Sequence, residues 1–467
     1  MNKSSRLLAC IFGCVICSAV AVLMIFPAAA AGGTSALSEK PLPYKSDGDL
    51  PERTPPLLEL GPKFLGRGAI SEGFVLPTGA VWQPALWVFG DFRSSVDYVH
   101  DPDSDNLSEV AASLELFGHL QLTPTERVLL GINPLLDTGQ STGYVFEPND
   151  ATDGFQNHFN MQITTLFFEG EFGELFPKLD PEDSGAYDLG FAVGRQPIFF
   201  QEGIMFNDTI DAFGINRDTV QFRGVVDMRV LGLFGWNQIG RDDNDEDETA
   251  YVLGLFTETD LRASTVNVDL AYIVSDQSDG GKGDGFYVGI AATQRFGLVN
   301  TSFRINGSWA IDNKNAAISD GYVVMAETSY TPAGGQNVVY LNGFAGIDHY
   351  SSASRSPSAG GPLGRVGILF AAPGLGRIGA PISNRADEVT GGALGYQMFF
   401  NGGRTQLIAE AGGRKDTSSN GTDAYGIGFR FQQAVAARHV LQVNAFGVNR
   451  ENESDVAGSR VEWRIRF

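Results

Sequence analysis

The chain has 467 residues, with 33 Lys and Arg against 55 Asp and Glu, which gives a formal net charge of −22. This acidic balance argues against nucleic acid as a partner, and the aromatic content of 11% excludes a disordered chain. Only one long apolar run exists, at the very start, so a multi-helix membrane protein is excluded as well.

The first segment, residues 1–31, is predicted to be a secretory signal peptide. Two basic residues precede an apolar stretch from Leu7 to Phe26, and an alanine run after Pro27 offers a cleavage site. An uncleaved membrane anchor is the alternative, because the stretch is almost long enough to span. All 3 Cys lie in this segment, so we expect the exported chain to carry no disulfide and no thiol metal site.

Residues 32–80 are predicted to form a periplasmic leader, and residues 81–467 the folded domain. Five prolines lie between Gly32 and Gly61, which favours a flexible extension. A segment that docks a partner is the alternative.

The rest of the chain alternates between apolar and polar residues with a period of two. In the last strand Val461, Trp463 and Ile465 alternate with charged neighbours, which indicates a strand with one apolar and one wet face. Eighteen such strands are predicted, with a count good to about two. They lie near 82–92, 109–121, 127–133, 158–171, 186–194, 216–226, 228–238, 250–258, 265–274, 285–294, 299–309, 321–330, 337–347, 390–400, 404–412, 424–432, 438–448 and 458–467.

The gaps between these strands alternate between long and short. Gaps such as 93–108, 239–249 and 348–389 are long, whereas 122–126 and 401–403 are tight; the gap at 172–185 is longer than a tight turn should be. This pattern predicts an all-β fold: a transmembrane antiparallel β-barrel of 16–18 strands in the bacterial outer membrane, with long extracellular loops and short periplasmic turns.

The expected surroundings of such a barrel are outer-membrane lipid and lipopolysaccharide. The final amphipathic strand ends on Phe467, which resembles the signal read by the outer-membrane barrel assembly machinery. That machinery is therefore an expected partner.

Two insertions are too apolar and too rich in glycine to be ordinary solvated loops. They are residues 194–213 and 360–385. Apolar loop segments must be buried away from water, and the barrel interior is the nearest place where they can be buried. We therefore expect one or both insertions to fold inward and form a constriction. Packing against a neighbouring barrel or lipid is the alternative. The polar residues expected at the constriction are Gln196, Asn207, Asp208 and Asp211.

Two patches resemble the alginate-export-type outer-membrane porin family. One is Gly194-Arg195-Gln196 followed by Phe200, Gly203, Asn207-Asp208 and Ile210-Asp211; the other is Phe64-Leu65-Gly66, Gly73-Phe74, Leu76-Pro77-Thr78-Gly79-Ala80 and Trp87-Val88-Phe89-Gly90. Together they cover about a seventh of the chain. The resemblance implies an arginine-lined pore that passes an anionic polysaccharide, whereas the net charge of −22 departs from a simple basic pore.

Alternation places most strand arginines on the polar face, while acids gather in the gaps. Fixed guanidinium groups in a narrow channel attract carboxylates. The predicted pore-lining residues are Arg93, Arg195, Arg223, Arg304, Arg404, Arg430 and Arg464. The alternative is that these arginines pair with lumenal acids and only stiffen the wall.

No catalytic site is expected, since the chain contains no Gly-x-Ser-x-Gly elbow and its five His form no evident dyad. No cofactor is expected either. Two acidic triplets have the spacing of calcium loops but lack the turn glycine and the distal Glu, so they are only weak Ca²⁺ candidates. They are Asp101, Asp103 and Asp105, and Asp243, Asp245 and Asp247.

These features predict a porin for passive transport of anionic, carboxylated solutes or of a polyuronate such as alginate. Two alternatives remain open: a non-selective diffusion porin, and a plugged barrel whose acidic outer loops bind a partner.

Overall fold

The computed structural model describes residues 54–65, 72–148, 153–182, 184–276, 280–418 and 421–467. The predicted signal peptide and the leader up to residue 53 lie outside this part. The described residues from Pro55 to Phe467 belong to one compact unit.

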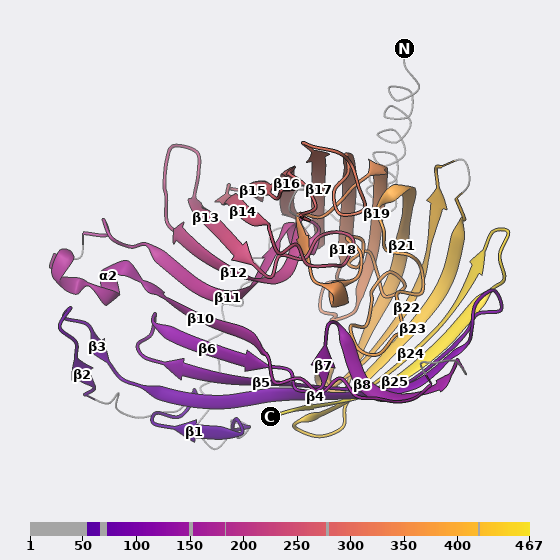
Figure 1. Cartoon of the computed structure of the whole chain (residues 1–467), viewed down its shortest axis with the longest axis horizontal. Coiled ribbons are helices and arrows are strands. Elements are labelled where there is room, and N and C mark those ends of the chain that lie inside the picture. The colour runs from indigo at the N-terminus through magenta and orange to yellow at the C-terminus, as the bar shows by residue number, and fades with distance from the viewer. Residues whose placement is uncertain (1–53, 66–71, 149–152, 183, 277–279, 419–420) are drawn as a thin grey trace, which may run out of the picture. The chain divides into compact units, whose positions relative to one another are not determined.

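This unit is a closed antiparallel β-barrel in which eighteen of the twenty-three strands of one sheet form the wall (Figure 1). The wall strands are β4 (Ala85–His100), β5 (Leu107–Gln121), β6 (Arg127–Ile132), β10 (Ile163–Glu171), β11 (Gly190–Phe200), β12 (Phe206–Arg217), β13 (Asp227–Asn237), β14 (Tyr251–Asp260), β15 (Ser264–Val274), β16 (Gly285–Phe296), β17 (Val299–Ala310), β18 (Gly321–Tyr330), β19 (Val338–His349), β21 (Asp387–Phe400), β22 (Thr405–Asp416), β23 (Ala424–Ala434), β24 (His439–Arg450) and β25 (Val456–Arg466). The ring closes where β25 pairs with β4, with Arg464 opposite Arg93.

The remaining elements are short. The strands are β1 (Leu58–Leu60), β2 (Phe74–Val75), β3 (Val81–Trp82), β7 (Leu136–Asp137), β8 (Gln140–Glu147), β9 (Gly154–Gln156) and β20 (Ser354–Arg355); the helical turns are α2 (Phe172–Leu175), η2 (Pro177–Leu179), η3 (Gln201–Gly203), η5 (Pro357–Ala359) and η6 (Asn401–Gly403). Within the described residues, no helix has the length and apolar character needed to cross a bilayer.

The alternation read from the sequence sets which way each side chain points. On β14, Leu253 and Leu255 are exposed on the outside of the wall, whereas Val252 and Phe256 are buried on the inside. Lipid covers an exposed apolar face of this kind, and a closed ring leaves no backbone edge in the bilayer.

The connections differ in length at the two ends of the barrel, as predicted. One end carries residues 238–250, 275–284, 311–320 and 350–386, whereas the other has turns such as 261–263 and 297–298. The connection at 172–189 is the long exception at the turn end. We name these the extracellular and periplasmic ends, following the usual arrangement of such barrels.

Three sequence-based boundaries were wrong. The predicted strand at 216–226 is mostly a connection, because the strand β12 runs over Phe206–Arg217. The predicted gap at 93–108 shrinks to 101–106, since Val96 and Tyr98 continue the outward apolar face of β4. In the predicted leader, β1 pairs with β4, so this stretch is part of the sheet.

Candidate functional site

The hairpin of β11 and β12 leaves the wall halfway along its length. The two strands pair with each other from Gly190 to Phe200. However, β10 pairs with β11 only up to Arg195, and β13 pairs with β12 only from Asp211 onward. Residues 196–210 therefore have no neighbour in the wall; we name them the inner hairpin.

The inner hairpin packs against the inner face of the wall strands β14, β15 and β17. At its tip, Gln201 donates a hydrogen bond of 2.6 Å to the Asp269 carboxylate on β15. Phe200 stacks on Phe256 of β14 with ring centroids 3.5 Å apart. Glu202 lies 3.6 Å from Arg304 on β17. These contacts hold the hairpin against the lumenal side of the wall.

A second inward segment is the connection between β19 and β21, residues 350–386, which we name the inner loop. Its apolar residues Leu363, Leu369 and Phe370 are fully buried and belong to a cluster with the lumenal residues Phe344 and Val389. Because these residues cluster with side chains on the lumenal side of the wall, the loop packs inside the barrel.

Glu410 on β22 anchors the middle of the inner loop. Its carboxylate accepts hydrogen bonds of 2.9 Å from the backbone N–H groups of both Ile368 and Leu369, and another from the Tyr340 hydroxyl. A Cβ at Gly367 would overlap this carboxylate, so the close approach requires glycine.

Arginines on the wall hold the next part of the inner loop. Arg460 donates to the carbonyl of Leu375 at 3.0 Å, and Arg93 donates to the carbonyl of Pro373 at 3.1 Å. Arg93 also forms an ion pair with Glu462 at 2.7 Å. Its guanidinium therefore binds groups of the protein itself and stabilises the contact between the wall and the inner loop.

Arg355, in β20, joins the two inward segments. Its side chain is 1% exposed and donates to the carbonyls of Gly203 and Ile204 at the hairpin tip, and to Gly360 of its own loop at 3.2 Å. β20 also pairs in parallel with the start of β12. Burial lowers the pKa of Arg355 and raises the pKa of the nearby Asp242.

Two of the cavities beside these segments are large enough to hold a small solute. One, of about 540 Å³, lies between the wall and the inner loop and is lined by Arg304, Arg365 and Arg430. The other, of about 530 Å³, lies beside the inner hairpin and is lined by Glu258, Asp269 and Arg304 among others. Glu202 and Arg304 line both, so the cavities adjoin.

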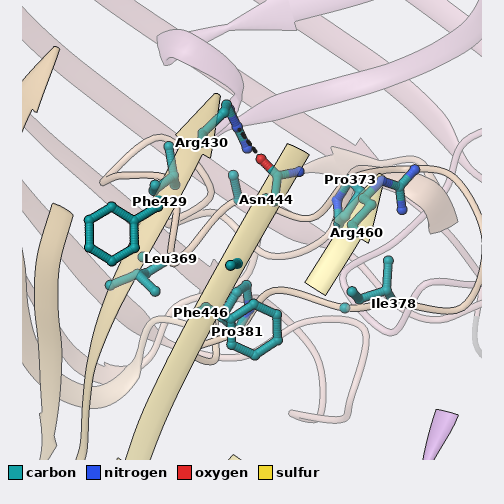
Figure 2. Close-up of a pocket in the computed structure, with 14 residues that line it drawn as sticks. Leu369, Pro373, Ile378, Pro381, Phe429, Arg430, Asn444, Phe446 and Arg460 are labelled. Carbon is teal, nitrogen blue, oxygen red and sulfur yellow. Dashed lines mark hydrogen bonds between the residues drawn. The ribbon is translucent and has the colours of Figure 1, made fainter. Parts of the chain in front are cut away.

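Arg430 on β23 differs from Arg93, Arg304 and Arg464 because it forms no ion pair with an acid in the described part of the chain. It donates one hydrogen bond, from Nε to Asn444 Oδ1 at 2.9 Å (Figure 2). Among the described residues, no carboxylate lies within ion-pair distance of it. The rest of its guanidinium thus stays available to a solute in the 540 Å³ cavity.

The other predicted pore-lining residues in the lumen are paired with acids. Arg304 pairs with Glu327, Arg464 with Asp91, and Arg93 with Glu462. For these three the structure favours the alternative reading, in which arginines stiffen the wall.

Three predicted pore-lining arginines do not line the lumen. Arg195 shares the outward-facing side of β11 with the exposed Val193. Arg223 is exposed in the connection at 218–226, and Arg404 is exposed in the turn before β22. The prediction failed because alternation was extended through residues that leave the strands or belong to the outer face.

The four predicted constriction residues are placed differently from one another. The Gln196 side chain is buried and donates a hydrogen bond of 3.1 Å to the carbonyl of Ala212. The backbone of Asn207 pairs with the backbone of Arg355 in β20. Asp208 accepts bonds from the Ser354 hydroxyl and the Gly240 amide at 2.6 and 2.8 Å. Asp211 lies outside the constriction, because it pairs with Arg195 on the outer face at 2.8 Å.

Five of the six acidic residues in the two triplets form ion pairs. Asp101 and Asp103 bond Arg450, Asp243 and Asp245 bond Lys282, and Asp247 bonds Arg241. In the described ranges, no three potential ligand side chains gather to hold a metal ion. The weak Ca²⁺ assignment is therefore not supported.

The sequence analysis expected the inner loop to fold inward but did not name its arginines as functional residues. Arg365 reaches Glu202 of the inner hairpin, and Arg385 bonds Asp242 at 2.9 Å. The repeated Gly-Arg-x-Gly at 364–367 and 376–379 was the available signal, because a glycine on each side of an arginine permits tight packing of the backbone.

No protein-family model matches the sequence, and no curated protein matches it either. Solved structures do match. OccK1 (OpdK) of Pseudomonas aeruginosa is 11% identical with a TM-score of 0.52, covering 81% of this chain and 98% of that chain. OpdK solved with vanillate is 12% identical with a TM-score of 0.51, covering 81% and 98%. OccAB3 of Acinetobacter baumannii is 10% identical with a TM-score of 0.50, covering 81% and 99%.

At these identities the likeness concerns the fold, and OpdK is described as an outer membrane protein. The chain shares with these proteins a closed antiparallel barrel of eighteen strands. With its apolar outer face, this fold belongs in a bacterial outer membrane.

Proposed function

We propose that the chain is a porin for passive transport of small carboxylated solutes, which pass between the inner hairpin, the inner loop and the wall. The proposal involves no cofactor and no catalytic chemistry. Outer-membrane lipid, lipopolysaccharide and the barrel assembly machinery remain its expected partners.

The observation that carries this proposal is Arg430. A guanidinium with no paired acid, facing a cavity of about 540 Å³, offers two parallel N–H donors to a carboxylate. Arg304 and Arg365 line the same cavity but pair there with Glu327 and Glu202, so among the described residues of this lining Arg430 is the arginine without an ion pair. Vanillate, the molecule present in one OpdK structure, is a carboxylate small enough to serve as a probe.

The resemblance to alginate-export-type porins makes a polyuronate the second candidate solute. Its support is the pair of sequence patches alone, because the inner hairpin and inner loop narrow the route available to a polymer. A general diffusion porin and a plugged barrel are the remaining readings.

Channel block in a planar lipid bilayer separates these readings. We would add vanillate, an oligouronate and a neutral oligosaccharide of matched size to the full exported chain and record the current. Block by vanillate without block by the neutral sugar supports the proposal, and stronger block by oligouronate shifts the solute to a polymer. No discrimination indicates a general porin, and no current at all indicates a plugged barrel; either result overturns the proposal.

A further inference from the structure

Glu202, at the tip of the inner hairpin, lies where the two lumenal cavities meet. It lines both the cavity of about 540 Å³ and the cavity of about 530 Å³, together with Thr293 and Arg304. Its side chain is 40% exposed. A solute in either cavity therefore meets this carboxylate.

Two arginines from different elements converge on the Glu202 carboxylate. Arg365 of the inner loop pairs with one of its oxygens, and Arg304 of β17 lies 3.6 Å from the other. At that distance the contact with Arg304 is an ion pair but not a hydrogen bond. The two guanidinium groups thus form a carboxylate site whose occupant belongs to the protein and leaves part of the site's hydrogen-bonding capacity unused.

The left-handed backbone at the tip is unusual for the residue types found there. Gln201 and Glu202 have φ values of 52° and 56°, which residues with a Cβ rarely adopt. The turn η6 between β21 and β22 has nearly the same backbone, with φ and ψ of 65° and 33° at Gly402 against 56° and 34° at Glu202. That turn uses Asn401 and Gly402, which adopt this conformation readily. The backbone therefore favours glycine at position 202, and the carboxylate is present in spite of it.

The backbone on each side of Glu202 is held in place. Gln201 donates a hydrogen bond of 2.6 Å to Asp269, and the carbonyl of Gly203 accepts one from Arg355. The half-exposed side chain of Glu202 can nevertheless change rotamer. Rotation of this side chain alone is enough to withdraw its carboxylate from the two arginines.

We propose that Arg304 and Arg365 form a second carboxylate site in the lumen, which Glu202 occupies in the empty channel and yields to the carboxylate of a solute. The site rests on the proposed function, because it serves the same carboxylated solutes. Arg430 lines the cavity of about 540 Å³ and not the one of about 530 Å³, so the second site passes the carboxylate from one cavity to the other. Competition from Glu202 keeps the solute from binding too tightly to leave, as conduction requires.

Block of the single-channel current by vanillate measures the strength of this site, and vanillyl alcohol supplies the same ring without the carboxylate. Glu202→Gln removes the competing charge and keeps the shape of the side chain. The vanillate concentration that halves the current should therefore fall at least about fivefold. The response to vanillyl alcohol should not change. Adding Arg365→Gln to Glu202→Gln should cancel the gain, because half of the site is then missing.

Glu258→Gln is the matched control. Glu258 lines the cavity of about 530 Å³ and is 49% exposed, but its ion pair is with Arg229. Its loss should change the half-blocking concentration by less than about twofold. Glu202→Gly is the second variant, since glycine fits the left-handed backbone; it should fold at least as well as the unaltered chain and give the same gain as Glu202→Gln.

The outcomes separate this site from the function on which it rests. If vanillate blocks the unaltered chain and Glu202→Gln equally, or if Glu258→Gln gives the same gain, Glu202 is not a competitor and the second site is overturned, while the proposed function stands. Block that appears only in Glu202→Gln and Glu202→Gly supports the site and counts against passage of vanillate through the unaltered chain. Absence of block in the unaltered chain and in every variant overturns both.

Discussion

At the scale of single residues, the contact between Gly367 and Glu410 decides whether the inner loop stays against the wall. Gly367→Ala would push a methyl group into a carboxylate that already accepts from Ile368 and Leu369. Overpacking of this kind costs about 1–3 kcal/mol. We expect a lower thermal unfolding temperature and a noisier single-channel current.

Gly379→Ala is the matched control, because it lies in the same loop and a Cβ there meets nothing within 4 Å. It should behave as the unaltered chain. Equal effects of the two substitutions would show that the Glu410 anchor has no special role.

A second residue-scale prediction concerns the buried ion pair in the connection between β13 and β14. Arg241 and Asp247 are both 0% exposed and lie 2.9 Å apart. Burial alone would raise the pKa of Asp247, but hydrogen bonds from Ser275 and Lys282 together with the charge of Arg241 outweigh it and lower this pKa.

A carboxyl whose pKa is lowered by folding stabilises the fold above its usual pKa of about 3.9, and the contribution disappears as the pH falls through the lowered value. The protection factors of the amide hydrogens in residues 238–250 should therefore stay high from pH 8 to about pH 5 and fall below about pH 4. Asp247→Asn should give low protection factors at every pH, at a cost of about 3–5 kcal/mol for the unpaired Arg241. High protection factors in that variant would contradict the assignment.

Residue positions could be predicted from sequence only where the strand pattern is regular. Arg304, Arg430 and Arg464 lie within long alternating strands, and alternation placed them in the lumen. Arg195 failed because the same face of β11 is outside at its start and inside at its end. The alternation of apolar and polar residues along β11 does not show where this strand leaves the wall. The pairing of Arg304 with Glu327 and of Arg464 with Asp91 joins residues distant in the sequence, which the pattern does not contain either.

At the scale of elements, the inner hairpin and the inner loop act as one inward assembly joined through Arg355. Arg355→Met would leave the carbonyls of Gly203 and Gly360 without this donor, whereas Ile204 would keep the hydroxyls of Tyr350 and Ser352. Each buried carbonyl without a partner costs about 1–3 kcal/mol. We expect the two segments to separate, which should appear as switching between two conductance levels and as a lower unfolding temperature.

Arg295→Met is the control, because Arg295 is exposed and bonds only within its own turn. Arg355→Lys should give an intermediate effect, since one ammonium cannot reach all of these carbonyls. A steady, unchanged current in Arg355→Met would refute the joint role of the two segments.

The sequence predicted that both insertions are buried, because their apolar residues would be exposed to water in an ordinary solvated loop. It did not predict their forms. Residues 194–213 are mostly a paired hairpin and not a loop, since the pattern of Phe199, Phe206 and Ile210 fits strands as well as irregular packing. Their mutual contact through Arg355 joins positions about 150 residues apart, which local patterning does not reveal.

At the scale of the whole molecule, the barrel is acidic in total but not uniformly so. The net charge of −22 belongs to the whole chain, whereas the cavity of about 540 Å³ is lined by Arg304, Arg365 and Arg430 together with Glu202 and Glu327. The charge felt by a passing solute is that of the lumen, since surface charges beyond about 8 Å are screened at physiological salt.

The central claim is that Arg430 gives this lumen its preference for anions, and reversal potential under a KCl gradient tests it most directly. The unaltered chain should favour Cl⁻ over K⁺, and Arg430→Ala should reduce that permeability ratio by at least about twofold. Arg223→Ala removes the same charge from an exposed periplasmic connection and should leave the ratio unchanged. A cation-selective channel, or an Arg430→Ala variant with the same ratio as the unaltered chain, would contradict the account.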